Sequence, residues 1–530
     1  MAASALVTGP TTGTTHAGNQ HPLYTYFAQK WLTLAHAVEG IGGFGDGTYL
    51  IGHPREYLDH DAATPVKPTA KLKERRRLAR YENWPLTLLT LLSGALFRAS
   101  ATRRAGDPSA TVTHPLADWW DDVDGLGTPI DVFMQRQWAA AATFGHMFLV
   151  MDRPPAEAAT RADAPRLYLR AYTPLDVPDW VLDEMGGLAA IALAEAAPRR
   201  TLGEAVAERI YTRHLTADGY TLAGAETVVA ASGLPRTGPS AIPGVLPVVV
   251  LYARRRPLVP LLGQSVLGDP QLYVDDYNLT SEVRELLRKQ TFSVINIPLG
   301  TGDAAQSLAD AQALLGNTTG TTNVLFSAQT AQILSPDTSN VDVYQAERQE
   351  LRRSMFRASG VPWEGDSKDA ESAESRKIKR EDLNQTLALF AGELEQADRM
   401  IARLWMQAEH GDGWQAAWDA ANVTIAYPRS FDADDLDTLI ARAQLAIGLG
   451  LGETATARLK AKVAQQLLPN QTPADEQQIT QEIEQAAADD SAHEATMREA
   501  KAAALAAGPR GQRGVVPPDD APDDADEGGQ

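Results

Sequence analysis

The sequence contains no cysteine among its 530 residues. This absence excludes disulfides, thiolate zinc sites and cysteine nucleophiles. A run of about 18 or more apolar residues is also missing, and such a run is what a spanning helix requires. The uncharged stretch from Pro85 to Phe97 is too short and has Arg80, Glu82 and Arg98 close to its ends. We therefore expect it to form a buried helix.

Positive charge is scarce as well. The chain has 48 Lys and Arg against 68 Asp and Glu, which gives a formal net charge of −20. A protein that binds phosphates across its general surface is expected to carry a positive net charge instead. Residues 71–80, KLKERRRLAR, are densely basic and predict a charged helical face. A solvated helix face is the commoner explanation of such a cluster, and a nucleic-acid surface is the alternative.

Signatures of catalysis are mostly missing too. The chain has no GxxxxGK[ST] phosphate loop and no HExxH zinc pair. The glycine-rich residues 42–47 lack a convincing preceding strand, and residues 263–268, GQSVLG, miss the GxSxG pattern by one position. Asp122 and Asp124 have EF-hand-like spacing, but Trp120 occupies the first ligand position. The sequence therefore predicts no catalytic residue, no cofactor and no metal site. Solvated acids are the commoner explanation of the 68 Asp and Glu, and a glycosidase-like carboxylate pair is the alternative.

The length of the chain predicts two to four domains or segments, because one core seldom fills so many residues. Residues 1–29 contain no Lys or Arg, so the basic region of a secretory signal is not expected there. Their Thr- and Gly-rich composition predicts a flexible arm. Residues 508–530 combine Pro, Gly and six acids, which predicts a disordered acidic tail.

Between these ends the pattern is α+β. A helix, a break at Gly145 and a buried strand at 147–151 are followed by short β-like runs within 166–262. Helical spacing returns at 271–290. The apolar side predicted for this helix consists of Leu272, Tyr273, Leu279, Val283, Leu286 and Leu287.

Three short strand candidates within 291–340 separate this helix from a second one at 341–359, which should end at Gly360 and Pro362. A polar segment follows. A long helix is then predicted from about Ser372 to Glu409, on the order of 55 Å in length. Its apolar or small residues have heptad spacing: Leu383, Leu387, Phe390, Leu394, Ala397, Ile401 and Leu404.

The order of these landmarks resembles the portal proteins of tailed double-stranded DNA bacteriophages, the head-tail connector family. The resemblance spans roughly residues 50 to 470. Each motif is degenerate, but their collinear order is hard to obtain by chance. The stretches that carry it are REYLDHD, LARYENWPLTLLTLLSGALFRA, WDDVDGLGTPIDVFMQRQWAAAATFGHMFLVMDRP, IPGVLPVVVLYA, ASGVPW and GLGLGETATARL.

This resemblance implies an α+β portal fold assembled as a ring. The implied parts are an N-terminal arm (1–29), the first part of a wing (30–270), a stem helix (271–290), a β-containing clip (291–340), a second stem helix (341–359), a tunnel loop (360–372), the spine helix with the second part of the wing (373–430), a helical crown (431–507) and the acidic tail (508–530).

The resemblance also implies a function without catalysis. A ring of usually twelve copies would form a channel at a unique capsid vertex, in the virion and in the host cytoplasm during assembly. Double-stranded DNA would pass through it during packaging and ejection without sequence-specific binding. The implied partners are the large terminase, the major capsid or scaffolding protein and a head-tail adaptor, with no membrane. Twelve copies would carry about −240 formal charges, which weakens contacts that a moving duplex would have to break.

Two sets of side chains are implied at the channel. Glu364, Asp366, Lys368, Asp369 and Glu371 would form a mobile loop facing the duplex, with Lys368 offering a transient phosphate contact. The second set, on the two stem helices, consists of Arg284, Arg288, Lys289, Arg348, Arg352 and Arg353.

The stem cations are expected to pair with acids of neighbouring subunits, and exposed pairs of this kind are worth only about 0–1 kcal/mol each. Without the resemblance, a solvent-exposed connection and an antiparallel helix pair in a globular core would explain both segments.

Two other functions remain open at this point. One is another structural head component, such as a minor head protein or an adaptor without a channel. The order of helix, insert, helix, loop and long helix disfavours it. The other is a DNA-processing packaging enzyme, which the missing phosphate loop disfavours.

Overall fold

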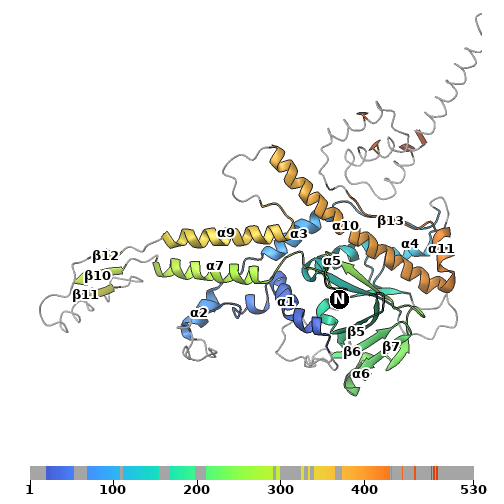
Figure 1. Ribbon diagram of the computed structural model, residues 1–530, viewed down its shortest axis with the longest axis horizontal. Helices are drawn as coiled ribbons and strands as arrows, with labels where there is room; N and C mark the ends of the chain where they lie inside the picture. Colours follow the sequence, from blue (N-terminus) through green and yellow to red (C-terminus); the bar gives the residue numbers. More distant parts are fainter. Residues whose placement is uncertain are drawn as a thin grey trace, which may run out of the picture. The chain divides into compact units, whose positions relative to one another are not determined.

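The computed structural model describes residues 20–52, 56, 69–107, 112–153, 166–196, 210–290, 294–298, 324–327, 332–334, 339–363, 373–429 and 431, and a few helical positions within 444–486 (Figure 1). The chain divides into two compact units, Met1–Phe431 and Asp432–Gln530. In the second unit only isolated helical positions are described. The predicted crown helices and acidic tail therefore lie almost entirely outside the described residues.

Helix α1 (Pro22–Glu39) begins earlier than the sequence suggested. His21 caps it by accepting a hydrogen bond from the Leu23 N–H on Nδ1, and Pro22 suits the first turn. Tyr24 and Phe27 are buried in the main core. Residues 22–29 thus belong to a packed helix, and the predicted arm 1–29 is too long by this segment.

Helix α3 (Trp84–Leu96) is the uncharged stretch that was expected to be buried. Asn83 caps it, with its Oδ1 accepting from the Leu86 N–H. Leu88 and Leu92 on one face are buried, whereas Leu91 on the other face is 51 % exposed. The prediction of a buried helix is therefore correct for one face only. The basic segment before it forms α2 (Ala70–Leu78), capped by Thr69.

The core of the first unit surrounds a three-stranded antiparallel sheet with β2 in the middle. Helix α5 (Ile130–Phe144) ends at Gly145, and the chain turns directly into β2, as predicted. Both neighbours of β2 are antiparallel, so β2 is paired on both sides, and all but one of its residues are buried. The strands are β2 (His146–Asp152), β3 (Tyr168–Tyr172) and β9 (Val248–Tyr252).

At Gly145 the backbone lies in close contact with the backbone of Gly263. The φ of Gly145 is +98°, and a Cβ there would lie 2.4 Å from the backbone carbon of Gly263. A Cβ on Gly263 would in turn lie 2.0 Å from the carbonyl oxygen of Gly145. Two glycines therefore permit a backbone contact that no larger residue allows.

A second antiparallel sheet has five strands in sequence order, β4 to β8. Glu195 of this sheet is buried and accepts hydrogen bonds from the hydroxyls of Tyr172 and Tyr211, both at 2.5 Å. Arg213 pairs with Glu195 at 3.0 Å and with Asp152 of β2 at 2.6 Å, so it joins the two sheets. The strands are β4 (Asp179–Leu182), β5 (Leu188–Ala196), β6 (Ile210–Thr216), β7 (Gly219–Ala223) and β8 (Thr237–Pro239).

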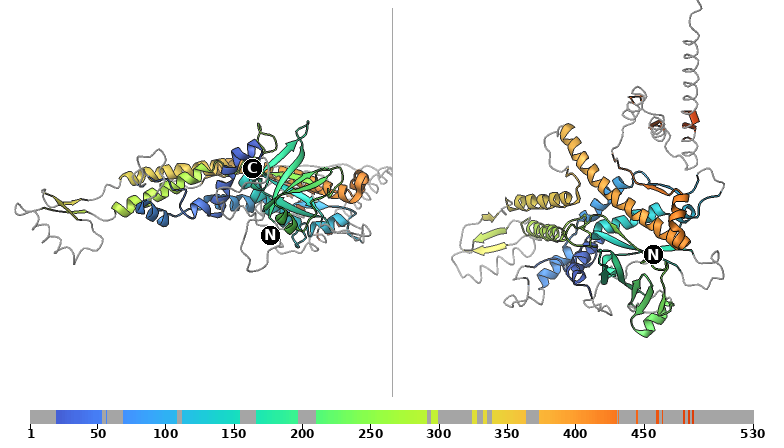
Figure 2. Two further views of the ribbon diagram at one scale, coloured as in Figure 1. Left: turned by 90° about the horizontal axis from the view of Figure 1, so that it is seen from below. Right: turned by 45° about the vertical axis from the view of Figure 1, so that its right-hand side comes forward.

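Helices α7 (Gln271–Gln290) and α9 (Ser339–Ser359) lie side by side in both views of Figure 2 and run in opposite directions. The chain between them contributes a three-stranded sheet with the order β11-β10-β12. The helix–strands–helix succession predicted from the sequence is therefore confirmed. The strands are β10 (Val294–Pro298), β11 (Val324–Ser327) and β12 (Gln332–Leu334).

Helix α10 (Ala373–His410) is within two residues of the predicted long helix. Leu387, Phe390, Leu394, Ala397 and Ile401, all from the heptad series, are buried. Within the described residues, no helix is both long enough and apolar enough to span a bilayer.

Several shorter elements are also described in the first unit. They are η1 (Gly42–Phe44), β1 (Thr102–Arg104), α4 (Pro115–Trp120), η4 (Pro174–Asp176), α6 (Glu226–Ser232), η5 (Gly411–Gly413), α11 (Trp414–Ala420) and β13 (Thr424–Ala426), which pairs with β1.

His146, the first residue of β2, makes stability depend on pH. Its side chain is fully buried, Nδ1 accepts a hydrogen bond from the Gly263 N–H at 3.2 Å, and burial lowers its pKa to about 3. The unfolded chain, with a pKa of about 6.5, binds the proton more readily between these values, so stability falls as the pH drops below about 6.5. This group alone should cost about 2 kcal/mol between pH 7 and pH 5. Chemical denaturation of the chain and of His146→Gln at both pH values measures the difference, and equal pH-dependent losses would contradict it.

Candidate functional site: the joint of helices α7 and α9

The buried face of α7 is more polar than the sequence suggested. Tyr273 and Val283 from the predicted apolar side are buried, but Leu287 is 43 % exposed. Four polar side chains of α7 are buried instead: Asp276, Asn278, Thr280 and Ser281. Buried polar groups need partners, because each unpaired one costs about 1–3 kcal/mol. Thr280 donates to the Asp276 carbonyl within α7, whereas the other three side chains have partners on α9 or in residues 49–82. We call the contacts of α7 with α9 and with residues 49–82 the α7–α9 joint.

Glu82, just before α3, holds two arginines of α9. Its Oε1 lies 3.0 Å from Arg348, and its Oε2 lies 2.6 Å from Arg352. These arginines are four residues apart, so both point from the same face of the helix. Arg348 also contacts the Oδ1 of Asp276 on α7 through Nε, at 3.1 Å. One buried guanidinium therefore connects α7, α9 and the segment before α3.

Burial raises the pKa of Asp276, and the guanidinium groups of Arg348 and Arg352 oppose this rise. Asp276 is 4 % exposed and Arg348 is 8 % exposed. A buried pair of this kind adds little net stability, but removal of one partner is costly because the other charge is left without compensation. The pair therefore fixes the geometry of the joint.

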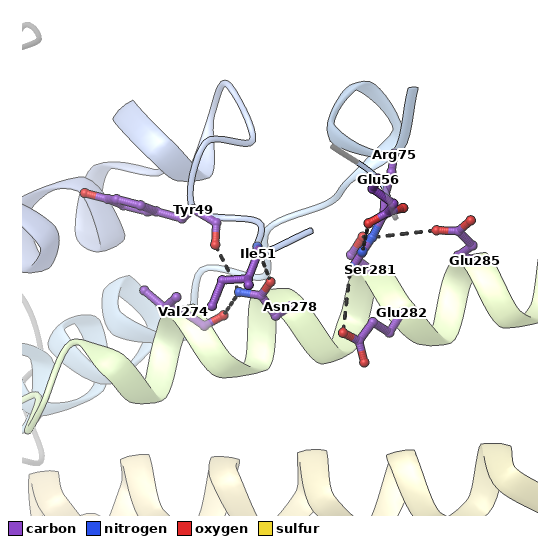
Figure 3. Close-up of polar contacts among 9 residues, drawn as sticks. All are labelled: Tyr49, Ile51, Glu56, Arg75, Val274, Asn278, Ser281, Glu282 and Glu285. Carbon is purple, nitrogen blue, oxygen red and sulfur yellow. Dashed lines mark hydrogen bonds and ion pairs between the residues drawn. The ribbon is translucent and has the colours of Figure 1, made fainter. Parts of the chain in front are cut away.

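Arg75 of α2 makes the second contact set, on the side of α7 that faces away from α9 (Figure 3). Its Nε donates to the Ser281 hydroxyl at 3.0 Å, and its NH1 pairs with Glu56 at 3.0 Å. Glu282 and Glu285 of α7 lie 3.6 and 3.7 Å from the same guanidinium. With a side chain only 5 % exposed, Arg75 anchors α2 to α7.

Asn278 joins α7 to the chain after α1. Its Nδ2 donates to the Tyr49 carbonyl at 3.0 Å and to the Val274 carbonyl at 2.8 Å. Its Oδ1 accepts from the Ile51 N–H at 2.8 Å (Figure 3). The side-chain amide of Asn278 thus forms hydrogen bonds through both its oxygen and its nitrogen. Residues 49–75 hold α7 on one side, and α9 holds it on the other.

Aromatic side chains close the joint at the C-terminal end of α9. The Arg352 guanidinium lies 4.8 Å from the ring centre of Trp84. Trp363 packs edge-on against Phe356 at 4.8 Å and against Trp84 at 6.3 Å. Gly360 ends the helix with φ +74°, where the sequence predicted the end. Residue 363 is therefore fixed against α9 and against the start of α3.

The predicted cations have different positions. Arg348 and Arg352 are in the joint, and their described acidic partners belong to the same chain, whereas neighbouring subunits were expected to supply them. Arg353 pairs with Glu350 at 3.2 Å on the outer surface of α9. Arg284 is half-buried on α7. The other predicted site residues are Arg288 and Lys289, whose side chains lie outside the described residues, and Glu364, Asp366, Lys368, Asp369 and Glu371, which lie wholly outside them.

Sequence reasoning missed the acids and amides of the joint. Asp276 interrupts the predicted apolar face of the helix, which was a usable signal for a buried polar contact, whereas Asn278 lies on another side of the helix and gave no such signal. Glu56, Arg75 and Glu82 gave no such signal, because isolated charges in polar surroundings are usually solvated.

The contacts of the joint are suited to holding helices in place. In the part of the chain that the structure describes, no group of three or more Asp, Glu or His could hold a metal ion. The carboxylates of Glu82 and Asp276 face guanidinium groups, which are permanently protonated. Such buried pairs can hold helices in register.

The fold is a mixed α+β arrangement in which one core carries a tied helix pair. No family model and no curated protein matches the chain. Among solved structures, it is similar to a chain from the neck of an empty gene transfer agent particle, with 14 % identity and a TM-score of 0.41 over 76 % of this chain and 97 % of that one. A chain from the virion of a native gene transfer agent particle is similar over 71 % of this chain and 88 % of that one, with 13 % identity and a TM-score of 0.37.

Proposed function

We propose that the chain is the subunit of a portal ring, a non-enzymatic channel at one capsid vertex for packaging and ejecting double-stranded DNA. The observation that carries this proposal is the succession α7, strands β10 to β12, α9 and the 38-residue α10. It follows the order of stem, clip, stem and spine that the sequence motifs implied. Residues 364–372 of the tunnel loop and nearly all of the crown lie outside the described residues.

The α7–α9 joint supports the same proposal physically. A channel subunit needs stem helices that keep their position while a motor acts on the DNA inside the ring. In this chain both helices are tied to the same body, α9 through Glu82 and α7 through Arg75 and Asn278. A net charge of −20 per copy also weakens adhesion of a passing duplex.

Imaging of the purified chain tests the ring directly. We expect particles of one high mass with a central opening in electron micrographs, and mass photometry at several salt concentrations should give the copy number. Monomers at every salt concentration would contradict the proposal. Closed particles without an opening would favour another head component instead.

The loop is tested by replacing residues 364–371 with a Gly/Ser linker of equal length. Ring mass should stay unchanged, while packaging or retention of DNA in particles should fall. As a control, Arg357→Ser removes an exposed charge close to the loop and should leave packaging intact. Loss of assembly in the linker variant would mean that the segment is structural.

A further inference from the structure

Helix α2 has a basic face that points away from α7. Leu72 is fully buried and Arg75 points into the joint, so the opposite side of the helix faces outward. The three cations on that side of the helix fall within an arc of about 100° centred roughly opposite Arg75, and a fourth follows just after the helix. We call these four residues the α2 basic face: Lys73, Arg76, Arg77 and Arg80. Three of them are exposed, and Arg76 is half-buried.

The charges of the α2 basic face have few partners within the chain. Arg77 pairs with Glu74 of the same helix at 2.9 Å. The other three cations form no ion pair with another described residue. The helix dipole favours cations in the last turn, but Lys73 lies near the positive N-terminal end, where the dipole disfavours it. The face therefore has positive charge that the described part of the chain does not compensate.

Helix α9 has an acidic face on the side opposite Arg348. Its first twelve residues, 339–350, contain three acids and one cation, and the cation is Arg348, which points into the joint. The three acids are exposed and fall within an arc of about 140° centred roughly opposite Arg348. We call them the α9 acidic face: Asp342, Glu347 and Glu350. Glu350 pairs with Arg353 and Arg357, whereas the other two acids form no ion pair with another described residue.

The two faces lie on opposite sides of the α7–α9 pair and at the same level along it. Helix α2 is on the side of α7 that faces away from α9, and the α9 acidic face points away from α7 (Figure 3). Asp276 of α7 lies 3.1 Å from Arg348 and 3.9 Å from Arg352 of α9. Because the two helices run in opposite directions with the same rise per residue, the part of α7 that holds Arg75 is level with about residues 339–347 of α9. That stretch of α9 contains two acids of the α9 acidic face.

We propose that the α2 basic face of one copy docks onto the α9 acidic face of the next copy in the ring. This inference rests on the proposed portal ring. A ring of more than two copies is built from heterologous contacts, in which two different and complementary surfaces of each chain meet. Opposite charges on opposite sides of one helix pair, at the same level, meet this requirement when the pair runs along the ring axis. Exposed ion pairs are weak one by one and are screened by salt, so they mainly fix the register between neighbouring copies.

The charges favour a second copy over a duplex at the α2 basic face. The net charge of −20 repels a duplex as it approaches. The face offers four cations, whereas strong, salt-dependent binding of a duplex draws on about 6–10 phosphate contacts. The α9 acidic face is present in every copy, so a ring supplies one acidic face for each basic face.

Cross-linking of the full chain tests the contact. Because the chain has no cysteine, Ala70→Cys on the outer side of α2 and Ala346→Cys within the α9 acidic face give one defined pair of exposed positions. A short bis-maleimide should join copies of the double variant into a ladder at low salt, and the yield should fall as salt rises. Each single-cysteine variant should stay unlinked, and a mixture of the two should give linked pairs only, because a heterologous contact needs one residue of each kind.

Charge reversal tests whether these particular charges hold the contact. K73E with R80E reverses the two exposed cations of the α2 basic face that have no described ion-pair partner, and it should lower the yield of the ladder at least about threefold. Adding D342K with E347K to the same chain places opposite charges on the two faces again and should restore the yield.

The matched control R98E with R380E reverses two exposed cations outside both faces and should leave the ladder unchanged. Equal yields in this control and in K73E with R80E would overturn the proposal. If K73E with R80E instead weakens binding of a short duplex and leaves the ladder unchanged, the face binds nucleic acid and not a second copy.

Mass photometry of the same samples separates this inference from the ring itself. Particles of one high mass whose copies are not linked in the double-cysteine variant would overturn the contact and leave the ring standing. Linking of Ala70→Cys alone would show that two α2 helices meet about a two-fold axis, which would also overturn it. Monomers at every salt concentration would contradict both the contact and the ring.

Discussion

Gly145→Ala should severely destabilise the first unit, by about 3 kcal/mol or more. Two costs add at this position. The φ of +98° is a backbone conformation that residues with a Cβ rarely adopt, and the new Cβ would lie 2.4 Å from the backbone of Gly263 and 2.6 Å from the backbone of Gln264. Because these atoms belong to the main chain, no side-chain rotation relieves the overlap. The Ala253 N–H also donates to the Gly145 carbonyl at 3.0 Å, so the central sheet would shift with it.

Gly125→Ala is the matched control. Gly125 also has positive φ, +71°, but a Cβ there would meet nothing within 4 Å. This variant should therefore show only the conformational cost, about 1–2 kcal/mol. Thermal melting and the yield of soluble protein would measure both variants. If the two lose equal stability, the close crossing of the chain at Gly145 and Gly263 does not determine the fold.

The fold was predictable from the sequence wherever one local pattern dominated. The uninterrupted apolar run after Gly145 gave β2, and the four-and-three spacing from Leu383 to Leu404 gave α10 nearly to its ends. Gly360 and Pro362 placed the end of α9 correctly. Each of these signals is contained in a few neighbouring residues, so no tertiary contact was needed to interpret it.

The joint could not be predicted in the same way, because its partners are far apart in the chain. Glu82 and Arg348 are 266 residues apart, and Arg75 and Ser281 are 206 apart. Nothing near Glu82 or Arg75 distinguishes them from the solvated charges of the chain. The expectation that the stem arginines pair between subunits came from the resemblance, and the described contacts of Arg348 and Arg352 are within one chain. The buried Asp276 and Asn278 were hidden for a related reason, since apolar residues alone defined the helix face.

Arg348→Met should cost about 3–5 kcal/mol, because it leaves Asp276 buried with its nearest cation removed. Arg352 can compensate only in part, since its Nε lies 3.9 Å from the Asp276 carboxylate. The same change removes the 3.0 Å contact to Glu82. Both consequences loosen α9 from α7 and from the chain before α3. Chemical denaturation would give the loss of stability, and limited proteolysis should show faster cleavage within α7 and α9.

Arg353→Met is the control for Arg348→Met, because it also removes one arginine charge from α9 but leaves no buried carboxylate without a partner. Arg353 is on the same helix, but its side chain is 40 % exposed and pairs with Glu350 on the surface, so its removal should cost at most about 1 kcal/mol. Adding Asp276→Asn to Arg348→Met removes the uncompensated charge and should recover part of the stability. A double-mutant cycle with a coupling energy near zero would mean that the two residues do not act as a buried pair. The cost of Arg348→Met would then come from the lost contact with Glu82.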